Sequence, residues 1–228
     1  MEIWMNELIF LGHVLVVLFF VFYAFKMGKY ALASLIAIQA VLANLFVLKQ
    51  IELFHFVVTA SDVFAIGSIV CANLLQEFFG KEILKKVISV TSFILLFFVA
   101  MSIFQLAYIP ATSDVSSIHF HMILNRMPRL LIASFVTFFI VQRMDAKFFG
   151  YLQLKFSKLS LKRRVGISLV FSQFIDTLLF SYLGLYGEYE KIWHVIVFSY
   201  IVKLSISLLM LIIWSLVPET IFKKRLET

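Results

Sequence analysis

Polar side chains that could bind a solute interrupt a long apolar run at residues 165–186, whose middle reads SQFIDT at 172–177. About 20 apolar residues in a row are enough to span a bilayer. A carboxylate inside such a run is costly and marks a functional-site hypothesis. Ser172 and Gln173 lie four and three residues before Asp176, so on a helix all three share one face. We expect that face to meet protein or a water-filled cavity.

Four further groups of polar residues lie inside or at the ends of other apolar segments. Their members are Gln39, Asn44 and Lys49; Asp62, Asn73 and Glu77; Asn125, Arg126, Arg129 and Ser134; and Tyr200 and Lys203. A bundle in which several helices each place a polar group inward is typical of a pocket for a polar solute. The sequence therefore predicts a polar site between helices.

Structural roles for the same residues stay open. Amide side chains often only join membrane helices, through hydrogen bonds worth about 0.6–2 kcal/mol. Arginines near a span end, such as Arg129, can simply extend to the interface. Asp62 and Glu77 lie close enough to span ends for water to solvate them, and Lys203 could form a purely structural ion pair with Asp176.

The composition defines the class of protein. Hydrophobic residues make up 62% of the 228 residues and charged residues 14%, whereas soluble domains are about half apolar and about a quarter charged. The mean hydropathy is +1.01. The single cysteine, Cys71, excludes a disulfide within the chain and argues against a cysteine-based metal site. We expect one integral membrane domain over residues 1–228.

Seven apolar segments are each long enough to cross a hydrocarbon core about 30 Å thick as a helix. They cover residues 7–25, 30–48, 56–79, 86–109, 124–142, 165–187 and 193–217. The first lacks the basic start and the cleavage site of a signal peptide. The expected fold is an all-α polytopic membrane bundle, with six core spans in 30–217 and one extra N-terminal span at 7–25.

The basic residues predict the orientation. Most of the 20 lysines and arginines fall in loops on one side, which the positive-inside rule assigns to the cytoplasm: Lys26, Lys29, Lys81, Lys85, Lys86, Arg143, Lys147, Lys155, Lys158, Lys162, Arg163, Arg164, Lys223, Lys224 and Arg225. The opposite loops receive Lys49, Arg126, Arg129 and Lys191. The N-terminus is then outside and the C-terminus inside. Contacts with anionic headgroups account for the net charge of +7 without nucleic acid as a partner.

The longest connection between the expected spans covers residues 143–164 on the cytoplasmic side. It mixes aromatic and aliphatic residues with basic residues, which is typical of an amphipathic segment on a membrane surface. We expect it to lie on the inner leaflet and to anchor the spans at 124–142 and 165–187.

Motifs of common enzymes are missing from the sequence. It contains no His-Glu-x-x-His zinc motif, no Gly-x-Ser-x-Gly elbow and no Walker A loop. His119 and His121 have the spacing of a metal pair, but they lie in an expected outer loop without a third ligand. We therefore predict a protein that is not an enzyme and that needs no catalytic residues, metal or cofactor.

Four blocks of residues carry a resemblance to a known family: NLLQEFFGK at 73–81; RLLIAS at 129–134, continuing to QRMD at 142–145; SQFIDTLLF at 172–180; and YIVK at 200–203. Their order and spacing resemble the queuosine-precursor transporter family, also grouped as vitamin uptake transporters. Members often have an aspartate where Asn73 stands and usually have six spans, so the run at 7–25 looks like an addition.

The resemblance implies a helical fold similar to the substrate-binding subunits of energy-coupling-factor vitamin transporters. It also implies import of deazaguanine bases, namely queuine or its cyano or aminomethyl precursors, for tRNA modification at a bacterial inner membrane. An alternative is a substrate-binding subunit of a multi-component vitamin transporter with another ligand. Energy would come from an ion gradient or a separate energising subunit, unless metabolic trapping of the base suffices. The candidate substrate-binding residues are Asp176, Gln173, Glu77, Asn73, Asn44, Arg129 and Lys203.

A guanine-like edge offers two adjacent donors, the ring N–H and the exocyclic amine, and one carboxylate can accept both. Asp176 is the first candidate for that acceptor and Glu77 the second. Gln173 and Asn73 could meet the carbonyl edge through their amides. Lys203 would pair with Asp176 while the site is empty.

Overall fold

The computed structural model of the protein describes residues 5–47, 49–53, 56–59, 61–124, 128–186 and 192–215. Apolar helices dominate it, because backbone polar groups in a membrane need partners within their own segment. Among the described residues, five helices are long and apolar enough to cross a membrane. They are α1 (Met5–Met27), α2 (Lys29–Phe46), α3 (Asp62–Phe79), α4 (Lys81–Ala107) and α7 (Leu161–Phe180), which continues into a π-helical turn, η1 (Ser181–Leu185). The chain is thus a multi-pass, mainly α-helical membrane protein.

The described residues form three more α-helices: the short α5 (Ser117–Leu124), α6 (Pro128–Lys155) and α8 (Ile192–Ser215). Charged residues interrupt the apolar sequence of α6 at Arg129, Arg143 and Asp145, so α6 is not among the five. The described apolar stretch of α8 is Ser199–Leu209. That α6 and α8 also cross the membrane stays a prediction.

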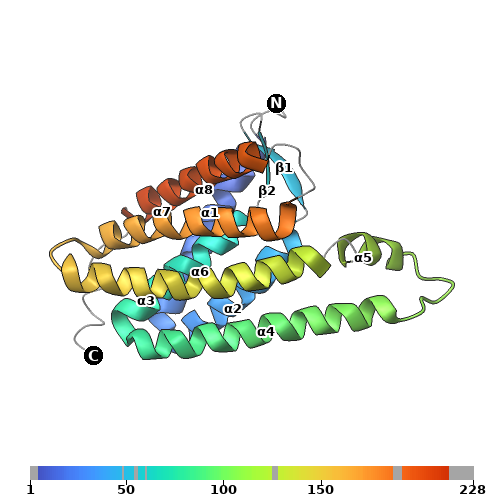
Figure 1. Ribbon diagram of the computed structural model, residues 1–228, viewed down its shortest axis with the longest axis horizontal. Helices are drawn as coiled ribbons and strands as arrows, with labels where there is room; N and C mark the ends of the chain where they lie inside the picture. Colours follow the sequence, from blue (N-terminus) through green and yellow to red (C-terminus); the bar gives the residue numbers. More distant parts are fainter. Residues whose placement is uncertain are drawn as a thin grey trace.

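Helix α3 occupies the centre of the bundle. It packs against α1, α2, α4, α6, α7 and α8, while α4, α6 and α7 lie side by side along the long axis (Figure 1). A Cβ atom on Gly67 of α3 would lie 2.2 Å from Gln39 Oε1 and 2.8 Å from Val17 Cγ1. A larger residue at this position would force the Gln39 side chain of α2 to move and would press against Val17 of α1, so glycine favours the close approach of α1 to α3.

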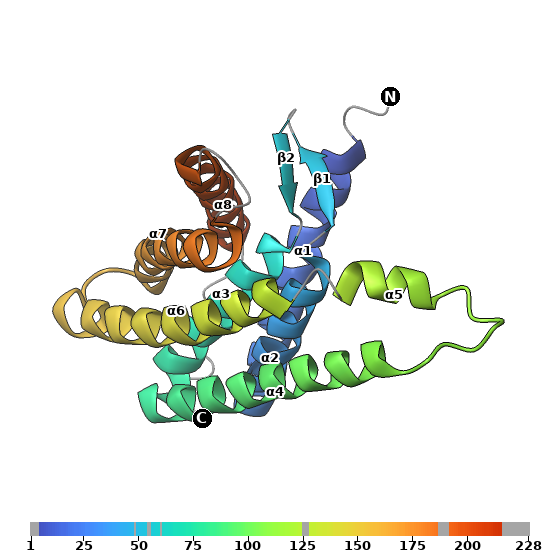
Figure 2. The same ribbon diagram turned by 45° about the vertical axis from the view of Figure 1, so that its right-hand side comes forward.

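The expected span at 56–79 is wrong at its start. Phe56–Thr59 forms strand β2, which pairs antiparallel with β1 (Gln50–Leu53), and α3 begins only at Asp62. The apolar run is continuous, but its first residues include Val57, Val58 and Thr59, and β-branched residues favour strands. The hairpin lies beside the start of α1 (Figure 2), where Asn6 Nδ2 donates to the Glu52 carbonyl oxygen at 3.1 Å.

The expected surface segment at 143–164 is also wrong. Helix α6 continues to Lys155, and only residues 156–160 connect it to α7. Phe149 and Leu152 are buried inside the bundle rather than exposed on a membrane surface. The helix continues because no proline interrupts it and because its inward residues pack against the neighbouring helices.

The N-terminal helix α1 is packed into the same core. Val14, Val17 and Val21 are buried, and the helix contacts α2, α3 and α8. Several residues named in the predictions lie outside the described residues: Leu48, Asn125, Arg126, Gly187, Lys191, 216–217, Lys223, Lys224 and Arg225.

Candidate functional site

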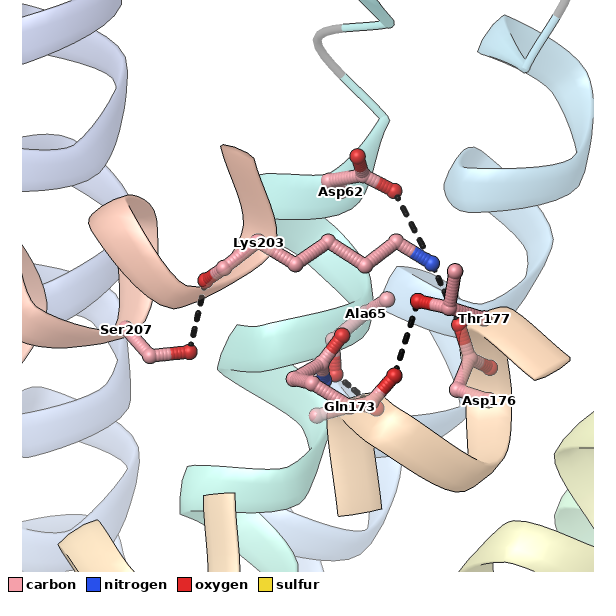
Figure 3. Close-up of polar contacts among 8 residues, drawn as sticks. Asp62, Ala65, Gln173, Asp176, Thr177, Lys203 and Ser207 are labelled. Carbon is pink, nitrogen blue, oxygen red and sulfur yellow. Dashed lines mark hydrogen bonds and ion pairs between the residues drawn. The ribbon is translucent and has the colours of Figure 1, made fainter. Parts of the chain in front are cut away.

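Three charged side chains, Asp62, Asp176 and Lys203, meet between α3, α7 and α8, and we call them the lysine cluster. Lys203 Nζ donates to Asp176 Oδ2 at 2.6 Å and lies 3.6 Å from Asp62 Oδ1. Figure 3 shows the lysine side chain extending between the two acids. The predicted ion pair between Lys203 and Asp176 is therefore confirmed. The expectation that water solvates Asp62 is wrong, since this residue is only 8% exposed.

The lysine cluster carries two formal negative charges against one positive charge. Lys203 is 5% exposed, so its charge acts inside the protein, where electrostatic interactions are stronger than in water. The Asp176 side chain is less enclosed, at 21% exposed. The excess carboxylate can accept hydrogen bonds from a solute with several donors or a positive charge.

A second polar group, the arginine cluster, consists of Glu77, Gln153 and Arg164 and joins α3, α6 and α7. Arg164 Nη2 donates to Glu77 Oε1 at 2.6 Å, and Gln153 Nε2 donates to Glu77 Oε2 at 2.7 Å. Both carboxylate oxygens of Glu77 are therefore engaged. The alternative in which water solvates Glu77 is therefore wrong. To bind a solute, either oxygen of Glu77 would first have to lose its present hydrogen bond.

The two clusters lie at opposite ends of α3. Asp62 begins the helix and Glu77 lies near its end, which at 1.5 Å per residue separates them by about 22 Å along the axis. Helix α7 runs antiparallel beside α3, because Arg164 near its start meets Glu77, while Asp176 near its end joins Asp62 through Lys203. Both clusters thus bridge the same two helices.

Two buried amides lie between the clusters along the helix axes, each near a different cluster. Asn73 lies one turn before Glu77 on α3, and Gln173 lies three residues before Asp176 on α7. Both are 0% exposed, and within the described ranges neither side-chain nitrogen nor oxygen of either residue has a hydrogen-bond partner. An unpaired buried polar group costs about 1–3 kcal/mol, which a bound solute or water would recover.

Asp145 of α6 forms a third polar site. Its Oδ1 accepts a hydrogen bond from Ser168 Oγ at 2.5 Å and another from Ser172 Oγ, both on α7. The aspartate is 1% exposed. The three residues of the polar face predicted on α7 therefore have different environments: Ser172 contacts Asp145, Asp176 contacts Lys203, and the Gln173 amide has no partner among the described residues.

Two of the candidate residues lie away from these clusters. Asn44 Nδ2 donates to the Ala40 carbonyl oxygen of its own helix at 2.8 Å. Arg129 Nε donates to the Leu183 carbonyl oxygen at 3.1 Å, and its Nη2 donates to that of Tyr186 at 2.6 Å. Arg129 thus holds the end of η1 against α6.

Sequence reasoning missed Asp145, Gln153 and Arg164 as interior residues, because it assigned them to a surface segment. A usable signal was present. Polar and apolar residues that prove buried recur at 142, 145, 146, 149 and 152, which is the helical period. Following that period past Arg143 would have extended the helix inward.

A multi-pass helical bundle with charged clusters at two levels and unpaired amides between them has the features of a membrane protein that handles small polar solutes. The family described as "Putative vitamin uptake transporter" matches residues 59–217, so the chain belongs to this family, as the sequence predicted. A "Probable queuosine precursor transporter" of Bacillus subtilis (strain 168) is 29% identical over 189 residues, which cover 81% of this chain and 82% of that protein. No solved structure shows significant similarity to the chain. The protein is a transporter and not an enzyme.

Proposed function

We propose that this transporter imports queuosine precursors, the deazaguanine bases queuine or its cyano or aminomethyl forms, across a bacterial inner membrane. The chain forms one membrane domain over residues 1–228, with the N-terminus outside and the C-terminus in the cytoplasm. The name of the Bacillus subtilis relative supports the substrate class. The observation that carries the proposal is the buried amide of Gln173, which has no hydrogen-bond partner among the described residues and lies three residues before Asp176 of the lysine cluster.

The chemistry of the site suits a guanine-like edge. Asp176 accepts the ring N–H and the exocyclic amine together, since a charge-assisted pair of this kind is strong and directional. Gln173 completes the carbonyl side of the base with its amide group. Asn73, the other predicted amide, lies 11 residues beyond Asp62 on α3, about 16 Å along the axis and nearer to Glu77, so it does not contact the same base. Asp62, which Lys203 holds at the longer distance of 3.6 Å, pairs with the amine of queuine or of the aminomethyl base.

The same arrangement discriminates against adenine. Adenine presents an acceptor where a guanine-like base has its ring N–H, so Asp176 would face a lone pair. An unpaired carboxylate in a site that excludes water is costly, and a mismatch of this kind separates ligands strongly. Excess adenine should therefore not compete for import.

The test is the queuosine content of tRNA in a bacterial host that neither makes nor imports queuosine precursors. The host expresses this chain together with the enzymes that use each base, and receives one base at low concentration. We expect restored modification, lost in Asp176→Asn. The matched control is Asp114→Asn, which changes an exposed loop acid in the same way. Normal modification in both Asp176→Asn and Glu77→Gln would contradict the proposed site, and no modification with any base would contradict the proposed substrate.

A second candidate follows from the family description. The chain would then be the substrate-binding subunit of a multi-component vitamin transporter. Such a subunit imports its ligand only when an ATPase module is expressed with it. Import by the purified chain alone in liposomes would contradict this candidate.

A further inference from the structure

We propose that Asp145, Ser168 and Ser172 form a proton-binding site that couples solute movement to a proton gradient. The inference rests on the proposed function, because a coupling site needs a transported solute. It concerns a group of residues separate from the lysine cluster, and it answers how a chain without an ATP-binding loop can accumulate a base.

The first observation is the isolation of the Asp145 charge. Asp62, Asp176 and Glu77 each lie within 4.0 Å of a lysine or arginine nitrogen. Within the described part of the chain, Asp145 has no such partner, and two serine hydroxyls are its hydrogen-bond donors. A buried carboxylate without a cation is costly in its charged form, so it is a suitable carrier of a reversible proton.

The second observation is a vacant oxygen. Oδ1 of Asp145 accepts from both serines, whereas Oδ2 is buried and, among the described residues, has no partner. Gln142 lies three residues earlier on the same face of α6, and its Oε1 is likewise unpartnered within the described ranges. Oδ2 of Asp145 is therefore free to carry a proton without losing a hydrogen bond to a described residue.

The third observation is the place of the serines on α7. Ser172 directly precedes Gln173 and lies four residues before Asp176, so the helix that holds the proton site also carries the proposed solute ligands. The two serine hydrogen bonds are strongest to a charged carboxylate. Protonation weakens them and loosens α6 from α7, which links proton binding to the helix that contacts the solute.

Most of the other charged groups near Asp145 are paired with each other or exposed. At this end of the bundle, the elements packed against α6 contribute the following charged residues: Glu77 of α3; Lys162, Arg163 and Arg164 of α7; and Lys81, Glu82, Lys85 and Lys86 of α4. The four residues of α4 and Arg163 are exposed. Glu77 and Arg164 neutralise each other. On α6 itself Arg143 and Lys147 flank Asp145 but are exposed. Tyr182 of η1 lies at the opposite end, and the titratable residues of α2, Lys29 and Tyr30, lie in its first turn.

The transport experiment uses the full chain in liposomes with a radiolabelled deazaguanine base. An inward proton gradient should drive accumulation above equilibrium, and a sodium gradient of the same size should not. Asp145→Asn keeps the shape of the side chain and mimics the protonated state. We expect it to lose gradient-driven accumulation while it still exchanges labelled for unlabelled base. Asp114→Asn, the exposed control, should behave like the unchanged protein.

Two further measurements keep the outcomes separate. Ser172→Ala removes a donor to the charged carboxylate, so the pH midpoint of accumulation should move to higher pH. Infrared difference spectra of the purified protein, without any solute, should contain a protonated-carboxyl band at acid pH that Asp145→Asn lacks.

Accumulation by Asp145→Asn, or accumulation driven by sodium instead of protons, would overturn the proton site. An unchanged infrared spectrum in Asp145→Asn would do the same, even if no base proved to be a substrate. Exchange and accumulation both missing in the unchanged protein, with the infrared band present, would instead contradict the proposed function.

Discussion

The lysine cluster and the arginine cluster bridge the same two helices, yet they differ in charge balance. The lysine cluster sets one cation against two acids, while the arginine cluster sets one cation against one acid and adds an amide. The first has one formal negative charge in excess. In the second the two formal charges balance, and both carboxylate oxygens of Glu77 accept hydrogen bonds. Two buried ion pairs on one helix therefore need not have the same role.

The largest expected effect breaks the lysine cluster. Lys203→Met leaves two carboxylates, the buried Asp62 and the partly exposed Asp176, without their counter-charge. Removing one partner of a buried pair costs about 3–5 kcal/mol. We expect import to be lost and thermal unfolding in detergent to occur at a clearly lower temperature. Lys203→Arg, which keeps the charge, is the control.

Arg164→Met should have a smaller effect, because it leaves only one acid without a counter-charge and Glu77 keeps the hydrogen bond from Gln153. An equal loss in both variants would remove the distinction between the clusters.

An intermediate effect sharpens the comparison. In the arginine cluster the two charges can be removed together, so Glu77→Gln combined with Arg164→Gln should be more stable than Arg164→Gln alone. Coupled buried pairs differ from additivity by about 0.5–3 kcal/mol. Asp176→Asn combined with Lys203→Gln should recover less, because Asp62 remains charged. Thermal unfolding of the single and double variants measures both couplings, and equal couplings would speak against the difference in charge balance.

The smallest expected effect concerns the part of α3 between the clusters. A methyl group at Gly67 would clash with Val17 and with the end of the Gln39 side chain. Because that flexible side chain can move aside, the cost lies at the low end of the about 1–3 kcal/mol typical of overpacking. Gly67→Ala should therefore lower the unfolding temperature. Gly12→Ala on α1 is the matched control, since a Cβ atom there meets nothing within 4 Å. If both alanine variants unfold at the same temperature, the close packing around Gly67 does not contribute to the stability of the bundle.

Hydropathy was sufficient to predict α1, α2, α4 and α7, because a run of apolar residues of membrane length has few other stable structures. It failed at residues 56–59 and 143–155, each for a physical reason. Residues 56–59 are as apolar as the helix that follows them, so hydropathy does not separate the strand from the helix. The charged residues of α6 have the composition of a loop, and only their buried partners show that they belong to a helix. Asp145 is buried because Ser168 and Ser172 meet it from another helix.

The ion pair of Lys203 with Asp176 could be predicted because both residues interrupt apolar runs, and opposite charges in a membrane seek each other. The partner of Glu77 could not. Arg164 comes 87 residues later, in a basic stretch whose members differ little in sequence. Which basic residue turns inward depends on the packing of α7 against α3, which a single sequence does not reveal.

The position of Lys203 in α8 has a consequence for biosynthesis. Ribosomes make the chain from its N-terminus, so Asp62 and Asp176 leave the ribosome before the lysine that neutralises them. Until α8 is inserted, α3 and α7 carry acids without their counter-ion. A chain truncated before residue 192 should therefore be less stable in the membrane than the full chain, because the last helix brings the counter-ion of two earlier ones.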